Sequence, residues 1–319
     1  MPQKGKPKGR RTKTWVALAV VVAGVVVIWF LALLVTGPAL SLAGGSALGK
    51  AALDRVNELV ALGPRPVGSE AHRKMERIII DQLKAAGVSV DEDRFTTDTP
   101  DGPVAMNNIS GRIPGRGGPS ARTIILATHY DTKIETKFQF VGANDGGSGT
   151  GLLLALAPLI AKRGFVHNVW LVFLDGEEAF HEWTATDSVY GSRHLAAQLQ
   201  SNGGVPKIGA FILLDMIGDK NLGILRDSNS TPWLRDVVWK VAGRLGYSKY
   251  FLSTGTAMED DHVPLLQAGV PSVDLIDFDY GPDQSYWHTA KDTADKLSAQ
   301  SLGIVGEVAL ETIAELDRQ

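Results

Sequence analysis

Two short runs in the chain, 170–174 (WLVFL) and 210–214 (AFILL), carry apolar side chains on both faces of a strand. A strand with two apolar faces has to be covered on both sides, as the central strands of a parallel or mixed sheet are between layers of helices. The sequence therefore predicts an α/β fold with three layers, in which a mixed, largely parallel central sheet carries helices on both faces.

From residue 50 onward, apolar residues recur with helical and with strand-like periods in turn. We expect helices at 51–62, 70–86, 148–162, 189–200, 232–245, 263–268 and 299–316. We expect strands at 88–95, 106–113, 123–128, 168–174, 208–214 and 272–276. No internal repeat is found, so 50–319 is predicted to be one domain.

An uncharged apolar segment, 15–35 (WVALAVVVAGVVVIWFLALLV), precedes this domain. A helix of that length reaches roughly 30 Å, the thickness of a bilayer core. Six basic residues lie before it and the first acidic residue is Asp54, which favours a cytoplasmic N-terminus. We expect a basic cytoplasmic tail (1–14), a transmembrane signal anchor (15–36), a linker (37–49) and a catalytic domain (50–319) on the periplasmic or lumenal side. The alternative is a signal peptide cleaved near 43–47 (AGGSA).

Charge and cysteine content narrow the class of protein. Without the six basic N-terminal residues, the formal net charge of −3 becomes about −9, which argues against nucleic acid as a partner. An acidic domain suits a substrate with a free α-ammonium group. The chain contains no cysteine, so it forms no disulfide.

Polar residues follow the predicted strands at the point where each strand ends. His129 and Asp131 follow one strand, Glu177 and Glu178 another, and Asp215 a third. Two further groups lie in loops, at Asp145 (GANDGGSG) and at Trp287–His288. Ligands of open α/β sheets bind at the carboxyl ends of strands. Imidazole and carboxylate ligands without thiolate suit a catalytic Zn²⁺ ion, and one of two adjacent glutamates can then transfer protons.

At these residues the sequence resembles the zinc aminopeptidase superfamily, and within it the glutaminyl-peptide cyclotransferase branch. The resemblance runs from about Ala51 to the C-terminus. Its motifs are LGPRPVGS (62–69), ATHYDTK (127–133), VGANDGGSG (141–149), DGEEAFHEW (175–183), DSVYGSRHLA (187–196), LLDMIG (213–218), EDDHVPLLQAGVP (259–271) and YWHT (286–289).

The resemblance implies an aminopeptidase-like fold and a role for each site residue. One zinc ion would be held by Asp145, Glu178 and His288, and Glu177 would be the general acid/base. A hydrogen-bond network around them would contain Asp215 and Asp260, with Asp261 as the alternative to Asp260. The substrate pocket would be walled by Trp183 and Trp287.

The implied reaction is cyclisation of an N-terminal glutamine of a peptide or protein to pyroglutamate, with release of ammonia. The parent activity is the alternative, because in two-zinc aminopeptidases the residues matching His129 and Asp215 bind a second metal beside Asp145, with Asp131 orienting His129. The longer segment 177–196, with Trp183 and Asp187, resembles the cyclases, whereas the Gly-rich turn at Asp145 resembles the peptidases. A third possibility, a receptor-like module without metal, fits poorly because all the ligands are present.

Overall fold

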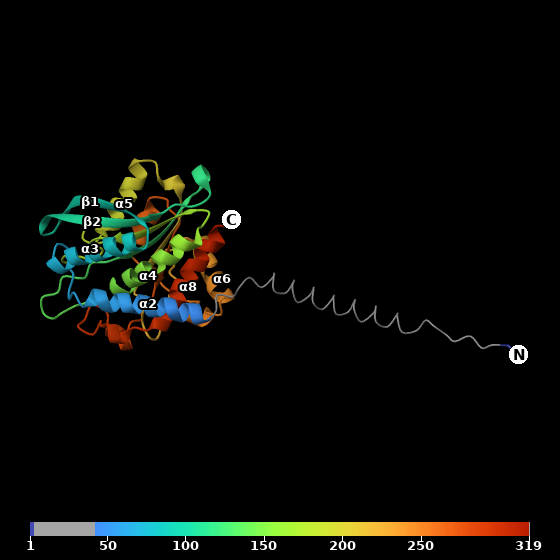
Figure 1. Ribbon diagram of the computed structural model, residues 1–319. Helices are drawn as coiled ribbons and strands as arrows, with labels where there is room; N and C mark the ends of the chain where they lie inside the picture. Colours follow the sequence, from blue (N-terminus) through green and yellow to red (C-terminus); the bar gives the residue numbers. More distant parts are fainter. Residues whose placement is uncertain (3–41, 319) are drawn as a thin grey trace. The chain divides into compact units, whose positions relative to one another are not determined.

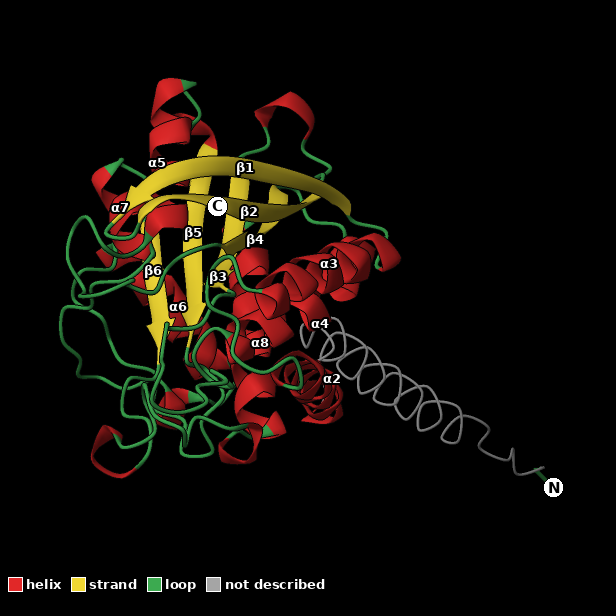
Figure 2. Ribbon diagram, turned by 90° about the vertical axis from the view of Figure 1, so that its left-hand side faces the viewer, coloured by secondary structure: helices red, strands yellow, loops and turns green. Residues whose placement is uncertain are grey.

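The computed structural model describes residues 1–2 and 42–318, and the domain from residue 45 onward forms one compact unit. Its centre is a six-stranded sheet with the strand order β1-β2-β4-β3-β5-β6 (Figure 2). The strands are β1 (Ser89–Thr99), β2 (Gly102–Ile113), β3 (Thr123–His129), β4 (Asn168–Leu174), β5 (Ile208–Asp215) and β6 (Ser272–Ile276).

The sheet is mixed and largely parallel, as predicted. β1 and β2 form an antiparallel hairpin, and β2 also pairs antiparallel with β4. The remaining neighbours, from β4 through β3 and β5 to β6, are parallel. All residues of β3 and β5 are buried, as expected for central strands. The hairpin is longer than predicted, because β1 and β2 continue past the apolar residues to a turn at Pro100–Asp101.

Helices cover both faces of the sheet and enclose two separate cores. One face carries α3 (Glu70–Ala85), α4 (Gly147–Arg163), α6 (Pro232–Arg244) and α8 (Ala299–Leu316), with α2 (Leu42–Val60) packed among them (Figure 1). The other face carries α5 (Tyr190–Ser201) and α7 (His262–Gln267) over a smaller core. The predicted three-layer arrangement is confirmed.

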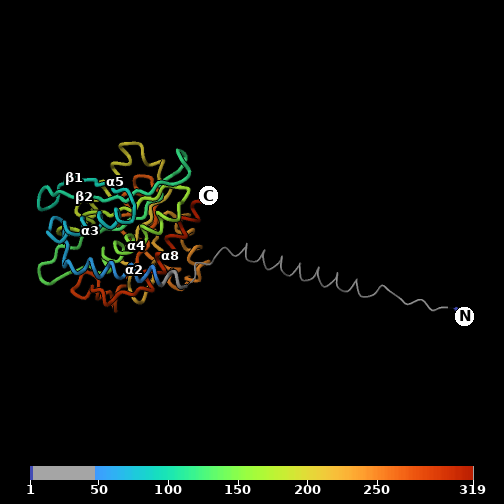
Figure 3. The backbone as a smooth tube through the Cα atoms, viewed as in Figure 1, coloured from blue at the N-terminus to red at the C-terminus, as the bar shows by residue number. Residues whose placement is uncertain are grey.

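α2 begins inside the range predicted to be a linker (37–49). The helix begins at Leu42, whereas residues up to Gly49 were expected to form a linker because they are small. At Gly49 the lack of a side chain serves packing: a Cβ atom there would lie 1.8 Å from the carbonyl oxygen of Ala299 in α8. α2 and α8 therefore lie side by side (Figure 3).

The predicted membrane anchor, 15–36, lies outside the described residues and stays a prediction. Within the described ranges, no helix combines the length and the apolar character needed to span a bilayer.

The first turns of α4 approach the sheet unusually closely. A Cβ atom at Gly149 would lie 2.1 Å from Oγ1 of Thr128 in β3 and 2.4 Å from the carbonyl oxygen of Leu214 in β5. Real Cβ atoms do not approach other atoms so closely, so the helix can lie at this depth only without a side chain at this position. The depth matters because Asp145 lies in the turn that leads into α4.

We predict that Gly149→Ala destabilises the domain by about 2–4 kcal/mol, because α4 has to move away from β3 and β5. Urea unfolding of the purified protein measures this change. Gly243→Ala is the matched control, because Gly243 is exposed in α6 and its Cβ would meet only Oγ of Ser248 at 3.5 Å. The control should be neutral or slightly stabilising. Equal free energies of unfolding for both variants would contradict the close approach.

Candidate active site

The carboxyl ends of the parallel strands bring the predicted site residues to one edge of the sheet. β3 ends at His129, β5 ends at Asp215, and β4 ends directly before Asp175 and the pair Glu177–Glu178. Because these strands are parallel neighbours, the three ends meet (Figure 2). Two loops complete the site, with Asp145 before α4 and His288 after β6.

Asp145, Glu178 and His288 converge on one point. Nε2 of His288 lies 3.2 Å from Oδ2 of Asp145 and 3.1 Å from Oε1 of Glu178. Neither oxygen accepts a hydrogen bond from the described residues, although both are buried. Unsatisfied buried oxygens are costly unless a cation binds them. One nitrogen and two carboxylates within 4.8 Å of one another are a donor set that fits a zinc ion.

A second group shares Asp145. Nε2 of His129 lies 3.2 Å from Oδ1 of Asp145 and 3.2 Å from Oδ1 of Asp215, and these donor atoms also lie within 4.8 Å of one another. Burial alone would lower the pKa of His129, but the surrounding carboxylates raise it well above its ordinary value. A protonated His129 can therefore neutralise these carboxylates in the place of a second cation.

Two buried aspartates outside the two donor groups bind the backbone of the loops that carry Glu177, Glu178 and Asp145. Asp131 accepts hydrogen bonds from the N–H groups of Glu177 and Glu178, at 3.1 and 3.2 Å. Asp292 accepts hydrogen bonds from the N–H groups of Asn144 and Asp145, at 2.8 and 3.2 Å. Sequence reasoning placed Asp131 only behind His129, whose Nδ1 is 3.5 Å away, and missed Asp292. No local pattern marks Asp292, because its partners are more than 140 residues away in the chain.

Glu177 is a buried carboxyl group beside this cluster. Burial is the main effect that raises its pKa well above the ordinary value, and the charges of Glu178 and Asp260 act in the same direction. His129, whose Nδ1 is 3.9 Å from Oε2 of Glu177, opposes the shift. A carboxyl group with a raised pKa can both accept and donate a proton near neutral pH.

A hollow of about 200 Å³, called the inner hollow below, opens over these groups. Its charged lining is Asp145, Glu177, Glu178, Asp215, Glu259, Asp260 and His288. Its apolar walls are Trp183, Met216, Met258, Ile276, Phe278 and Trp287. Trp287 stacks on His288 with ring centres 4.1 Å apart, and the edge-to-face contact with Phe278 holds it there. Trp183 and Trp287 both line the inner hollow.

The neighbouring aspartates 260 and 261 face different ways. Asp260 lines the inner hollow, whereas Asp261 accepts a hydrogen bond from Oγ of Ser192 in α5 at 2.5 Å. Oδ1 of Asp260 also accepts a hydrogen bond from the backbone N–H of Asp261. Of the two residues that the sequence left open, Asp260 is therefore the one in position to interact with Glu177 or a substrate.

Three residues at the site have left-handed backbone conformations. His288 has a φ of 50°, Met216 directly after Asp215 has a φ of 50°, and Val189 at the start of α5 has a φ of 45°. Residues with a Cβ atom rarely adopt these angles, and such strain concentrates at functional sites. The surrounding packing therefore has to hold His288 in place.

One carboxylate, that of Asp187, accepts several hydrogen bonds from the loop that carries Trp183. Asp187 accepts hydrogen bonds from the N–H groups of Phe180, His181 and Glu182 at 2.9–3.1 Å, and from the hydroxyl group of Tyr190 at 2.9 Å. These donors lower the pKa of Asp187 although its burial acts in the opposite direction. The loop residues 181–186 are exposed, so their order depends on such hydrogen bonds, those of Asp187 and those of Arg193 to the carbonyl oxygens of Thr186 and Ser188.

The geometry agrees with what comparisons with known proteins show. Residues 108–313 match the model of peptidase family M28. A glutaminyl-peptide cyclotransferase-like protein of Bos taurus is 31% identical over 281 residues, which cover 79% of this chain and 72% of that protein. The chain belongs to the glutaminyl-peptide cyclotransferase branch of family M28.

Solved structures of similar sequence share its fold. A glutaminyl cyclase of an Acidobacteriales bacterium is 46% identical, with a TM-score of 0.80 over 85% of this chain and 94% of that one. A zinc-dependent exopeptidase of Parabacteroides distasonis is 28% identical, with a TM-score of 0.72 over 83% and 97% of the two chains. The residues Asp145, Glu178 and His288 offer a donor set that fits a divalent metal ion.

We predict that Asp187→Asn loosens the Trp183 loop, because an amide offers one acceptor oxygen where the carboxylate offers two. The substitution should make ordering of the loop less favourable by about 1–3 kcal/mol. The KM for Gln-peptides should rise on the order of tenfold as a result. Steady-state kinetics and limited proteolysis of residues 180–186 measure both effects. Asp98→Asn, an exposed position in β1, is the control. An unchanged KM together with unchanged proteolysis would rule out Asp187 as the anchor.

Proposed function

We propose that this chain is a glutaminyl-peptide cyclotransferase, which converts the N-terminal glutamine of a peptide to pyroglutamate and releases ammonia. The observation that carries the proposal is the buried Glu177 in a hollow that also contains Asp145, Glu178 and His288. A hollow of about 200 Å³ has room for little more than one residue of a substrate. Membership of the cyclotransferase branch supports the same reaction.

We further propose that one zinc ion is held by Asp145, Glu178 and His288. The unsatisfied oxygens of Asp145 and Glu178 beside Nε2 of His288 support this ligand set. A zinc ion bound there would supply Lewis-acid polarisation of the side-chain carbonyl group of the glutamine. Because Asp145 and Glu178 raise the pKa of His288 to about 10 against the effect of burial, protons compete with the metal for this nitrogen.

Glu177 performs the proton transfer. Its carboxylate takes a proton from the α-amine as that nitrogen attacks the carbon of the side-chain carboxamide. The new C–N bond closes a five-membered lactam, and the C–N bond to the carboxamide nitrogen breaks. Glu177 gives the proton to this nitrogen, which leaves as ammonia. One carboxyl group with a raised pKa suffices for both transfers.

The other residues of the inner hollow orient the glutamine and exclude water. Trp183 and Trp287 press the side chain into a bent conformation, in which the amine and the carboxamide meet. Asp215 and Asp260 line the same hollow as Glu177 and would offer acceptors to the N–H groups of the amine. Because water is kept out, the amine attacks in preference to hydrolysis of the carboxamide.

An aminopeptidase is the second candidate, because His129, Asp145 and Asp215 have the donor geometry for a second cation. Metal content distinguishes the two proposals: a cyclase of this design needs one zinc ion per chain, and a two-metal peptidase needs two. The reaction products distinguish them as well.

We predict that the zinc-loaded protein releases ammonia from a Gln-Ala amide and leaves Leu-amide uncleaved. Glu177→Gln should lower kcat/KM by about two orders of magnitude or more with unchanged zinc content, because an amide cannot transfer the proton. Glu182→Gln, an exposed position in the Trp183 loop, is the control. Release of leucine would favour the peptidase, and near-normal turnover by Glu177→Gln would remove its assigned role.

We predict that His288→Ala loses zinc on dialysis, because only the two carboxylates of the proposed set remain. Atomic absorption of the dialysed protein measures the metal content. His181→Ala removes an exposed histidine, paired with Asp101 at the surface, and should retain zinc. If His288→Ala kept a full equivalent of zinc, His288 would not be a ligand.

A further inference from the structure

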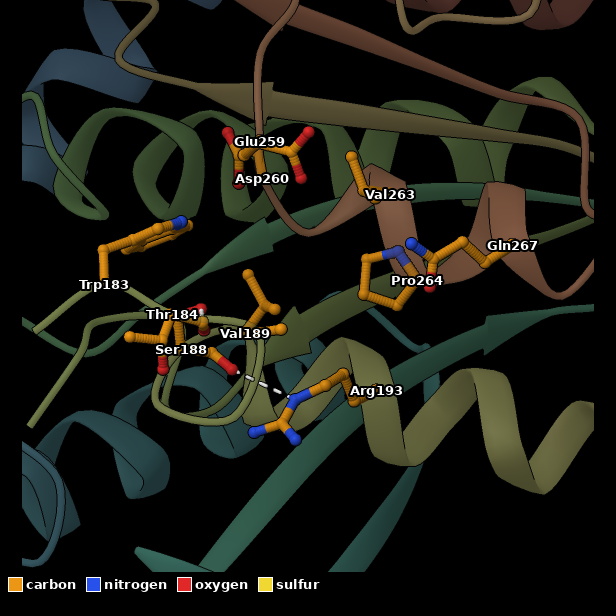
Figure 4. A pocket seen from close by; sticks show the side chains of 11 residues that line it. Trp183, Thr184, Ser188, Val189, Arg193, Glu259, Asp260, Val263, Pro264 and Gln267 are labelled. Atoms are coloured by element: carbon orange, nitrogen blue, oxygen red, sulfur yellow. Dashed lines mark hydrogen bonds between the residues drawn. The ribbon is translucent and has the colours of Figure 1, made fainter. Parts of the chain in front are cut away.

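A second hollow of about 230 Å³, called the outer hollow below, is drawn in Figure 4. It shares lining residues with the inner hollow. Trp183, Glu259 and Asp260 line both hollows, so no other layer of the protein separates them. The remaining lining residues come from the Trp183 loop, α5 and α7: Thr184, Ala185, Ser188, Val189, Arg193, Val263, Pro264 and Gln267.

A substrate chain that leaves the inner hollow has to continue along a neighbouring surface. The N-terminal glutamine is held with its side chain among the catalytic groups, so its own carbonyl carbon continues to the second residue. The outer hollow offers an apolar floor of Val189, Val263 and Pro264, and polar groups at its margin. Because the outer hollow lies next to the inner one and has both apolar and polar lining residues, it fits one or two further residues of a peptide.

Both hollows have carboxyl groups at their shared border, and only the outer hollow also has an arginine in its lining. The inner hollow and the shared border carry carboxyl groups, including the exposed Glu259, which suits the amine end of a peptide. Arg193 is the one cationic residue in the lining of the outer hollow. Figure 4 shows it on α5, with its guanidinium group directed toward Ser188.

Arg193 is held in position with its charge not neutralised. Its Nε donates a hydrogen bond to the carbonyl oxygen of Ser188 at 3.1 Å, and its Nη2 donates one to that of Thr186 at 3.2 Å. The guanidinium group also lies over the ring of Tyr190, 4.6 Å from its centre. Among the described residues, no carboxylate forms an ion pair with it. A guanidinium group has five N–H donors, so donors remain for a carboxylate.

We propose that the outer hollow receives the residues after the N-terminal glutamine, and that Arg193 selects peptides with a carboxylate on the second or third residue. The inference rests on the proposed cyclase function and adds the class of substrate: acidic peptides. Arg193 also supports the Trp183 loop through its two bonds to backbone carbonyls. Its loss therefore affects all substrates, and only the preference between substrates reports its charge.

The test compares peptides that differ by one charge. Gln-Glu-Ala-amide is paired with Gln-Gln-Ala-amide, and Gln-Ala-Glu-amide with Gln-Ala-Gln-amide, and kcat/KM is measured for each with the full-length protein. We expect the acidic peptide of at least one pair to be favoured on the order of fivefold at low ionic strength, with a smaller preference in salt. Gln-Ala-Ala as the free acid and as the amide shows whether a terminal carboxylate serves equally.

Three variants assign the preference to Arg193. Arg193→Gln should bring the ratio within each pair to about one, whatever happens to the absolute rates. Gln267→Glu places an opposing carboxylate in the hollow while Arg193 and its loop contacts stay, and should lower the ratio as well. Arg77→Gln removes an equal charge from the exposed side of α3 and should leave the ratio unchanged.

Each outcome decides the matter. Ratios of about one for the unaltered protein in both pairs, or an unchanged ratio in Arg193→Gln, would overturn the proposal while cyclisation itself continued. If none of the peptides were cyclised, including Gln-Ala-Ala-amide, the proposed function would fail, and the inference with it.

Discussion

The active site depends on one kind of interaction, the acceptance of backbone N–H groups by buried aspartates. The sheet brings the strand ends together. Glu177, Glu178 and Asp145, however, lie on loops, where no strand pairing supplies hydrogen-bond acceptors for the backbone N–H groups. Asp131 holds the backbone of Glu177 and Glu178, Asp292 holds that of Asp145, and Asp187 holds the loop of Trp183. A carboxylate accepts several charge-assisted hydrogen bonds at once, so one side chain orders a whole turn.

The strain at the site is a consequence of the same organisation. His288 and Met216 have left-handed backbone angles that residues other than glycine rarely adopt. Their energy has to be offset by the packing around them, such as the stack of Trp287 on His288 and its contact with Phe278. The two hollows share Trp183 and Glu259 at their border. The order of the Trp183 loop therefore affects both the orientation of the glutamine in the inner hollow and the path of the peptide through the outer hollow.

The sequence predicted the sheet, its helical layers and the groups that meet at its edge, because apolar strands and the residues directly after them are local signals. The prediction failed at residues whose role depends on contacts with distant parts of the chain. Gly49 was assigned to a linker, but it is small because α8 lies against it. Asp292 gave no signal, since its partners Asn144 and Asp145 are distant in sequence. The choice between Asp260 and Asp261 needed the direction of each side chain.

The chain orders these loops without a single cysteine. Hydrogen bonds from backbone amides to carboxylates are not altered by thiols or oxidants, whereas a disulfide across the same loops would open in a reducing compartment. The geometry around Glu177 is therefore independent of redox potential. A site built in this way needs no oxidative folding step.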